Sequence, residues 1–327
     1  MSAFLVLDFW MYVLVLAGIY TIFSLGLQIQ YGVAGLLNFG HIAMMALSSY
    51  SLAILVIKVG INFWFACILA VGIAALGGAF LGLTTLRLRG DYFAIVTTAF
   101  SEIVRYVANN QPGLTGGTEG SIAIRGKNGV NSFSDSFDHF LEKFQRFLQH
   151  IIGDYSQKRD TQMAILIWLL AFLLLYLVGR MEKTPWARVL RATREDDYVP
   201  AALGKNVFKF RLYALVIGSV IGGIAGICWA LQFTFVSPTD FMPLTTFYAW
   251  IIMILAGATR VRGIPLGAVI FTALFAGVRL INFPPFSWLS SGQQSYLRLV
   301  IIGFVLIWLM LRRPQGIFGK KEEMVLE

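Results

Sequence analysis

The chain has 327 residues, of which 57% are hydrophobic and only 13% are charged, and its mean hydropathy is +0.73. This composition excludes an ordinary soluble domain and indicates that the lipid bilayer is the main solvent. The net charge of +9 first suggests nucleic acid, but the basic residues lie at the ends of apolar runs, where anionic headgroups and membrane topology account for them. We expect no nucleic-acid partner.

Nine stretches are apolar and long enough to cross about 30 Å of hydrocarbon if some tilt is allowed. They lie at residues 9–30, 33–57, 62–86, 91–108, 162–180, 209–236, 245–260, 264–282 and 296–312. The first run is too long for the core of a signal peptide and follows Asp8 instead of a basic segment, which favours a first span. We therefore expect an all-α integral membrane protein, a polytopic helix bundle of about nine spans with possible broken helices.

The basic residues also predict the orientation. With the amino terminus outside, most of the 26 lysine and arginine residues fall on one side, chiefly in the 180–211 segment and after the last span. Short cytoplasmic loops are enriched in these residues, so that side is assigned to the cytoplasm. The junction at residues 28–35 leaves two interpretations open, a turn at the membrane surface or a break within the membrane. Whether the number of spans is odd or even depends on which one is correct.

Two spans carry a small residue at every fourth position, which lets neighbouring helices approach closely. The stripes are Gly218, Gly222 and Gly226 in one span, and Ala74, Gly78 and Gly82 in the other. Glycine has no side chain and could contact a substrate in a pore only through its backbone. We therefore interpret both stripes as helix-packing surfaces and not as substrate contacts.

A first polar segment lies within an apolar run, from Tyr31 to Tyr50, and includes Asn38 and His41. Polar groups at this depth need partners inside the protein. A helix broken here would aim free backbone N–H groups at a carboxylate. For His41 two interpretations stay open: a neutral imidazole bonded to a backbone carbonyl, or a residue of a transport pathway.

A second polar segment runs from Leu86 to Val107. Counted from Asp91 as a helix cap, Glu102 lies about 16 Å into the membrane, past the bilayer centre. It either pairs locally with Arg105 one turn later or contacts a substrate. Thr97, Thr98 and Ser101 add hydroxyl groups that line a polar path or bond back to their own helix.

The 109–161 connection is predicted to lie outside the cytoplasm. It begins with a glycine- and threonine-rich turn, Leu114 to Gly120. Apolar residues then recur at helical spacing at Phe140, Leu141, Phe144, Phe147, Leu148 and Ile151. Polar and charged residues occupy the opposite face, which predicts an amphipathic helix that lies in headgroups or contacts a partner.

Catalytic and metal-binding signatures are missing from the sequence. The stretch Arg125 to Asn128 lacks the leading glycine and the Ser or Thr of a nucleotide-binding loop. Three histidines and two cysteines are scattered without zinc or haem spacing, and Cys67 and Cys228 fall inside apolar runs as small hydrophobes. We expect no enzyme, no catalytic residue, no metal and no cofactor.

The segment from Arg191 to Gly204 is compact and charged and lies between two uncharged runs. Pro200 is able to begin a short helix and Gly204 to end it. Charges followed by Ala201, Ala202 and Leu203 favour a docking element over a solvated loop that merely orients the protein.

Five motifs in order resemble the permease of branched-chain amino acid ABC importers, the LivM type. They are GLLNFGHIAMMALSSY, LRLRGDYFAIVTTAFSEIVR, LTGGTEG, RATREDDYVPAALG and LAGATRVRGIPLGAVI, and they extend from about Tyr31 to Ile270. The resemblance implies a multi-pass permease of the bacterial inner membrane. It implies import of branched-chain or other neutral amino acids into the cytoplasm by ATP-driven alternating access, with ATP hydrolysed on separate subunits.

The resemblance also implies partners: a second, related permease, two cytoplasmic ATP-binding subunits and a periplasmic substrate-binding protein, besides membrane lipids. One permease domain would fill residues 1–327, with a cytoplasmic coupling loop at 181–208 and a cytoplasmic tail at 313–327. The residues implied to contact an ATPase subunit are Arg191, Arg194, Glu195, Asp196, Ala202, Leu203 and Gly204. Those predicted to line or gate the pathway are Asn38, His41, Thr97 and Glu102.

Three other functions stay open at this point. A urea permease of the same ABC class differs only in substrate. A secondary carrier or channel for small polar solutes would also use intramembrane Glu102 and His41, but it would not need a docking element for an ATPase. A membrane-embedded scaffold subunit would tolerate changes at the polar membrane positions without loss of uptake.

Overall fold

The computed structural model describes residues 7–88, 90–119, 134–152, 158–257 and 261–277, and the single positions 293, 297, 300, 303, 304, 307 and 312. Most of the predicted last span and the whole 313–327 tail lie outside the described residues. Every element in the described ranges is a helix, which confirms the all-α class. The main helices are α1 (Leu7–Gln28), α2 (Ile42–Ala53), α3 (Phe63–Thr85), α4 (Gly90–Asn110), α6 (Asp135–Ile152), α7 (Arg159–Met181), α8 (Pro185–Glu195), α9 (Tyr198–Ala202), α10 (Val207–Phe233), α11 (Pro243–Ala256) and α12 (Ile264–Gly277).

Shorter elements extend or join these helices. Two π-helical stretches, η2 (Ile29–Val33) and η3 (Ile54–Lys58), continue α1 and α2. One short helix, α5 (Pro112–Thr115), and three 3₁₀ turns complete the chain in the described ranges. The turns are η4 (Gly117–Glu119), η6 (Pro238–Phe241) and η7 (Val261–Gly263).

Four helical stretches of the described chain are long and apolar enough to cross a membrane. They are Asp8–Val33, Phe63–Thr85, Arg159–Met181 and Val207–Phe233. The predicted spans 245–260 and 264–282 are instead two short helices, α11 and α12 with η7, bent by 107° as one broken span or a re-entrant pair. The multi-pass architecture is confirmed, and the count of nine stays a prediction.

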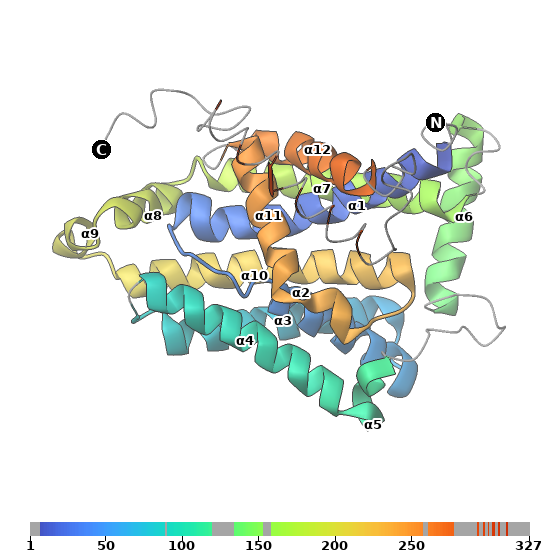
Figure 1. Cartoon of the computed structure of the whole chain (residues 1–327), viewed down its shortest axis with the longest axis horizontal. Coiled ribbons are helices and arrows are strands. Elements are labelled where there is room, and N and C mark those ends of the chain that lie inside the picture. Colours follow the sequence, from blue (N-terminus) through green and yellow to red (C-terminus); the bar gives the residue numbers. More distant parts are fainter. Residues whose placement is uncertain are drawn as a thin grey trace.

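Contacts at the two ends of the bundle fix the directions of the helices (Figure 1). At one end Lys158 forms an ion pair of 2.6 Å with Asp8, and Arg159 donates to the Leu231 carbonyl at 3.0 Å, which joins the starts of α1 and α7 to the end of α10. At the other end the Arg87 guanidinium lies 6.0 Å from the Phe208 ring. Figure 1 shows α8 and α9 at this second end and α6 at the first.

Helix α10 lies at the centre and packs against α1, α2 and α3. Its carbonyls at Gly223 and Gly226 accept hydrogen bonds of 2.7 Å from the hydroxyls of Ser48 and Ser49 in α2. A Cβ at Gly218 would lie 2.6 Å from the carbonyl oxygen of Gly26, so the backbones of α1 and α10 are in contact. In α3, Gly78 faces Ser219 and Gly82 faces Leu212.

Helix α6 is the amphipathic helix that the sequence predicts, and its apolar face is partly covered. Phe137 is buried, with its ring 5.1 Å from that of Phe63, and Phe140 lies 5.3 Å from Trp64 at the start of α3. Phe147 remains 64% exposed. The helix therefore closes one end of the bundle and still presents an apolar residue outward.

The α2–α10 contact predicts a large difference between two glycine substitutions. A Cβ at Gly226 would overlap the carbonyl oxygen of Met45, whereas a Cβ at Gly72 in α3 meets nothing within 4 Å. We expect Gly226→Ala to destabilise the fold by about 1–3 kcal/mol because helix backbones cannot repack easily. The control Gly72→Ala gains helix propensity and should be neutral or slightly stabilising. Thermal unfolding in detergent measures both; equal midpoints would contradict the packing.

Candidate functional site

A buried break precedes α2. The predicted span at 33–57 is not one helix: residues 34–41 are not helical, and α2 begins only at Ile42. Asn38, Gly40 and His41 in this stretch are buried. Of the two interpretations of the junction, the structure therefore has a break inside the bundle, later in the chain than residues 28–35.

Side chains of α4, of α11 and of the break itself accept hydrogen bonds from the backbone N–H groups of the break. Phe39 N–H donates to the Thr97 hydroxyl of α4 at 3.2 Å, and Ile42 N–H donates to the Thr246 hydroxyl of α11 at 3.1 Å. Gly40 N–H donates to the side-chain oxygen of Asn38 at 2.9 Å. The expectation of free amides aimed at a carboxylate is wrong for these three groups, because neighbouring hydroxyl and amide oxygens already occupy them.

Asn38 also connects the break to the central helix. Its amide nitrogen donates to the Gln30 side-chain oxygen at 2.9 Å, and the Gln30 amide nitrogen donates to the Leu215 carbonyl of α10 at 3.1 Å. Both side chains are fully buried. A buried relay of this kind is stable only when each member is paired, so it defines one position of the break.

Close backbone contact fixes the break against α4. A Cβ at Gly40 would overlap the carbonyl oxygen of Thr97. The Phe39 ring packs between Phe247 and Trp250 of α11, with centroid distances of 5.1 Å to each. The break is therefore held between α4 and α11 by backbone contact and aromatic packing as well as by hydrogen bonds.

The His41 ring occupies a slot made by two glycines. A Cβ at Gly26 or at Gly222 would lie 2.8 Å from its Nε2 atom, and the ring packs 4.7 Å from that of Phe23. The side chain is 0% exposed. His41 therefore packs against α1 and α10.

Glu102 lies apart from the other three predicted pathway residues and forms a local pair. Both of its carboxylate oxygens accept from Arg105, the shortest contact being 2.6 Å, and the Arg105 guanidinium lies 4.7 Å from the Tyr106 ring. Both side chains are partly exposed. Local pairing, one of the two interpretations of the sequence, is the contact present here.

Helix α8 is attached to the chain just before the break. The Arg194 guanidinium donates to the Gly32 carbonyl at 3.0 Å and lies 5.8 Å from the Tyr31 ring. A Cβ at Gly35 would lie 2.8 Å from Arg194 Cγ, and Gly35 has a φ of 70°, so a larger residue would be both strained and crowded there. Arg194 thus links α8 to the entrance of the break.

The predicted docking segment is a short helix, but Pro200 does not begin it. Helix α9 begins at Tyr198, whose N–H donates to the Asp196 carboxylate at 2.8 Å, and Pro200 is its third residue. Proline is tolerated there because the first amides of a helix have no partner within it. Gly204 follows with a φ of 73°.

The seven residues predicted to contact an ATPase subunit fall into two groups. Arg191 and Arg194 contact their own chain, at the Glu182 and Gly32 carbonyls. Exposed at the tip are Glu195, Asp196, Ala202, Leu203 and Gly204. The tip also exposes Tyr198 (84%), which the sequence analysis did not single out.

Sequence reasoning missed two hydrogen-bond partners of the break, Gln30 and Thr246. Gln30 is a polar residue at the end of an apolar run, directly before the glycine-rich segment, and this signal was sufficient to find it. Thr246 lies 204 residues from its partner Ile42. No local pattern in the sequence connects the two.

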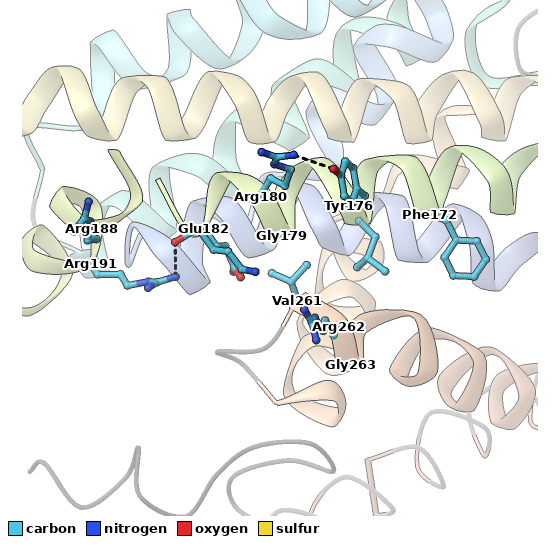
Figure 2. Close-up of a pocket in the computed structure, with 12 residues that line it drawn as sticks. Phe172, Tyr176, Gly179, Arg180, Glu182, Arg188, Arg191, Val261, Arg262 and Gly263 are labelled. Carbon is cyan, nitrogen blue, oxygen red and sulfur yellow. Dashed lines mark hydrogen bonds between the residues drawn. The ribbon is translucent and has the colours of Figure 1, made fainter. Parts of the chain in front are cut away.

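A basic cleft of about 1120 Å³ lies at the same end of the bundle as α8. Its walls come from the end of α7, from α8 and from η7, and they contain five cations: Arg180, Lys183, Arg188, Arg191 and Arg262 (Figure 2). Glu182 is the acidic residue among the described lining. Burial raises the pKa of Glu182 to about 7, against the opposing effect of Arg191, so near neutral pH this carboxyl group is only partly ionised.

Comparisons with known proteins give a consistent result. The sequence pattern of the family described as "Branched-chain amino acid transport system / permease component" matches residues 9–310. The high-affinity branched-chain amino acid permease LivM of Salmonella typhimurium is 31% identical over 91% of this chain and 67% of its own length, and that of Escherichia coli is 30% identical over the same shares. A probable LivM of Methanocaldococcus jannaschii is 24% identical over 93% and 91%. No solved structure matches.

The relay at the break predicts a specific pattern of energetic coupling. Asn38→Ala removes the partner of two buried groups, Gly40 N–H and the Gln30 oxygen, and should cost about 1–3 kcal/mol for each group left unpaired. The single variant Gln30→Ala removes one of these two groups, the Gln30 side-chain oxygen. The double variant should therefore be less destabilised than the sum of the single variants, by more than about 0.5 kcal/mol. Additive losses in thermal unfolding would mean that the relay does not form.

Proposed function

This chain belongs to the family of branched-chain amino acid transport system permease components, and we propose that it is the membrane-spanning permease subunit of an ABC importer. It moves branched-chain or other neutral amino acids into the cytoplasm by ATP-driven alternating access. Two ATP-binding subunits, a second related permease and a periplasmic substrate-binding protein complete the assembly, which lies in the bacterial inner membrane. The permease itself carries out no catalysis.

The exposed tip of α9 is the observation that supports this assignment best. Tyr198 and Leu203 are 84% and 74% exposed, and Figure 1 places α9 beyond the ends of the long helices. Exposed large apolar residues on a short helix mark a surface that a partner buries. An ATP-binding subunit is the partner that a transport permease needs at this end.

Helix α8 connects the docking helix α9 to the segment that enters the buried break. The Arg211 guanidinium forms an ion pair of 2.7 Å with Asp197 and donates to the Thr193 carbonyl at 2.9 Å, so α9, the end of α8 and the start of α10 are tied together. Arg194 then connects α8 to Gly32. Movement of α9 is thereby transmitted to the segment that enters the break.

The break acts as the gate. Asn38 of the break itself, Thr97 of α4 and Thr246 of α11 bind its backbone N–H groups, so a shift of α4 or α11 changes which of these groups are paired. His41 moves with the same segment. For ATP and the loaded receptor to drive transport, each must favour one of two arrangements of this gate over the other.

Glu102 serves the pathway from the partly exposed face of α4. Apolar residues of the same helix, including Tyr92, Ile95 and Ile103, are exposed as well and suit contact with the second permease. The pathway then lies along α4. Selectivity resides mainly in the soluble receptor, because a transport pathway must bind its substrate weakly enough to release it.

Uptake of labelled leucine, alanine, glutamine and urea tests the proposal in cells that express the chain with its partner subunits. Leu203→Asp places a charge on the exposed apolar tip and should reduce amino acid uptake to background while the protein remains inserted. Leu203→Met keeps an apolar side chain of similar size and should retain most of the uptake.

Two outcomes would overturn parts of this proposal. Unchanged uptake in Leu203→Asp, or uptake that survives without ATP-binding subunits, would remove the docking role and favour a secondary carrier. Uptake of urea in place of amino acids would retain the ABC mechanism and change the substrate.

A further inference from the structure

The basic cleft between α7, α8 and η7 has two chemically different ends. Toward one end five cations from three elements line the cleft, and Figure 2 shows Arg188 and Arg191 on one side of it and Arg262 below α7. At the other end Phe172 and Leu175 line the same cavity from within α7. Phe172 lies eight residues before Arg180, or about 12 Å deeper along the helix. The cleft therefore passes from a cationic mouth to an apolar interior over a short distance.

Three of the five cations have no partner in the described part of the chain. Arg180 donates to the Tyr176 hydroxyl at 3.0 Å, and Arg191 donates to the Glu182 carbonyl at 3.0 Å. Within the described residues no side-chain hydrogen bond or ion pair involves Lys183, Arg188 or Arg262. All three are exposed and line the cleft. Among the described residues, no acidic side chain forms an ion pair with any of the three.

We propose that this cleft binds one anionic phospholipid, with its phosphate at the end lined by Lys183, Arg188 and Arg262 and an acyl chain along Phe172 and Leu175. Arginine and lysine side chains supply the charge-assisted hydrogen bonds that a phosphate requires. Further apolar residues of α7, Leu169, Leu173 and Leu177, are also exposed.

The depth of the cleft distinguishes a lipid from other anionic occupants. Phe172 belongs to the stretch Arg159–Met181, which is long and apolar enough to cross the membrane. A water-soluble protein reaches the cations at the end of this helix, but it does not reach Phe172 inside the hydrocarbon. A free phosphate has no apolar group to pack against Phe172 and Leu175. A phospholipid contacts both the cations, through its phosphate, and these apolar residues, through an acyl chain.

The position of the cleft gives the lipid a consequence for the rest of the molecule. Arg188 lies on α8, the helix whose Arg194 contacts the entrance of the break, and Arg262 lies on η7 between the two bent helices. Because both residues line the cleft, a lipid that fills it contacts α8 and the α11–α12 bend. The inference does not depend on the identity of the transported solute.

Native mass spectrometry of the full chain, in the assembly in which it purifies, tests lipid binding with dioleoylphosphatidylglycerol and dioleoylphosphatidylcholine as probes. We expect one retained phosphatidylglycerol and no retained phosphatidylcholine. The double variant Arg188→Gln, Arg262→Gln should weaken retention about tenfold or more, given the contribution of each basic residue near an anionic surface. Its control, Lys205→Gln with Lys209→Gln, removes the same charge from exposed residues outside the cleft and should leave retention unchanged.

A second variant blocks the cleft without changing its charge. Gly179 lines the cavity, and a Cβ there meets nothing within 4 Å, so Gly179→Phe fills open space on a helix that tolerates the change. We expect it to lose the lipid while all five cations remain. Retention equal to wild type would show that general surface charge holds the lipid, and would overturn the proposal.

Two further outcomes would also overturn it. Inorganic phosphate that displaces phosphatidylglycerol at equal concentration would identify a site for a soluble anion. A crosslink from Leu175→Cys to a partner subunit, in place of lipid retention, would identify the cleft as a protein interface.

Discussion

The structure depends on one constraint: a backbone that leaves helical geometry inside a membrane protein must have its N–H groups bound by other parts of the protein. Residues 34–41 impose this requirement at the centre of the bundle. Thr97 of α4, Thr246 of α11 and Asn38 of the break itself meet it. The positions of α4 and α11 follow from these bonds, since both helices must bring a hydroxyl to the same short segment.

The same constraint suits the break to a transport cycle. Its partners are few and discrete, so a displaced helix leaves buried groups unpaired until a second complete arrangement is reached. Arg194 joins α8 to Gly32 directly before the break, and the glycines that surround His41 hold the other side against α1 and α10. A movement at α9 therefore reaches the buried segment through named contacts, which is the physical content of the proposed coupling.

Local sequence patterns were sufficient for the regular parts of this fold. The helices α3, α7 and α10 lie within a few residues of the predicted spans, and the pairing of Glu102 with Arg105 follows from their spacing on one helix turn. The start of α2 was not predictable in this way, because Thr246 caps it from 204 residues away. The 107° bend between α11 and α12 and the lining of one cleft by both Arg188 and Arg262 likewise depend on tertiary packing.

The central claim is that the break moves with α9 through Arg194, and thiol accessibility at the break tests it most directly. Leu37→Cys, in a chain with Cys67 and Cys228 changed to alanine, reports on a half-buried position within the break. We predict that its labelling rate in the assembled transporter differs between the nucleotide-free and ATP-bound states, and that Arg194→Gln abolishes this difference. A rate that is the same in both states, or a nucleotide effect that persists in Arg194→Gln, would contradict the account.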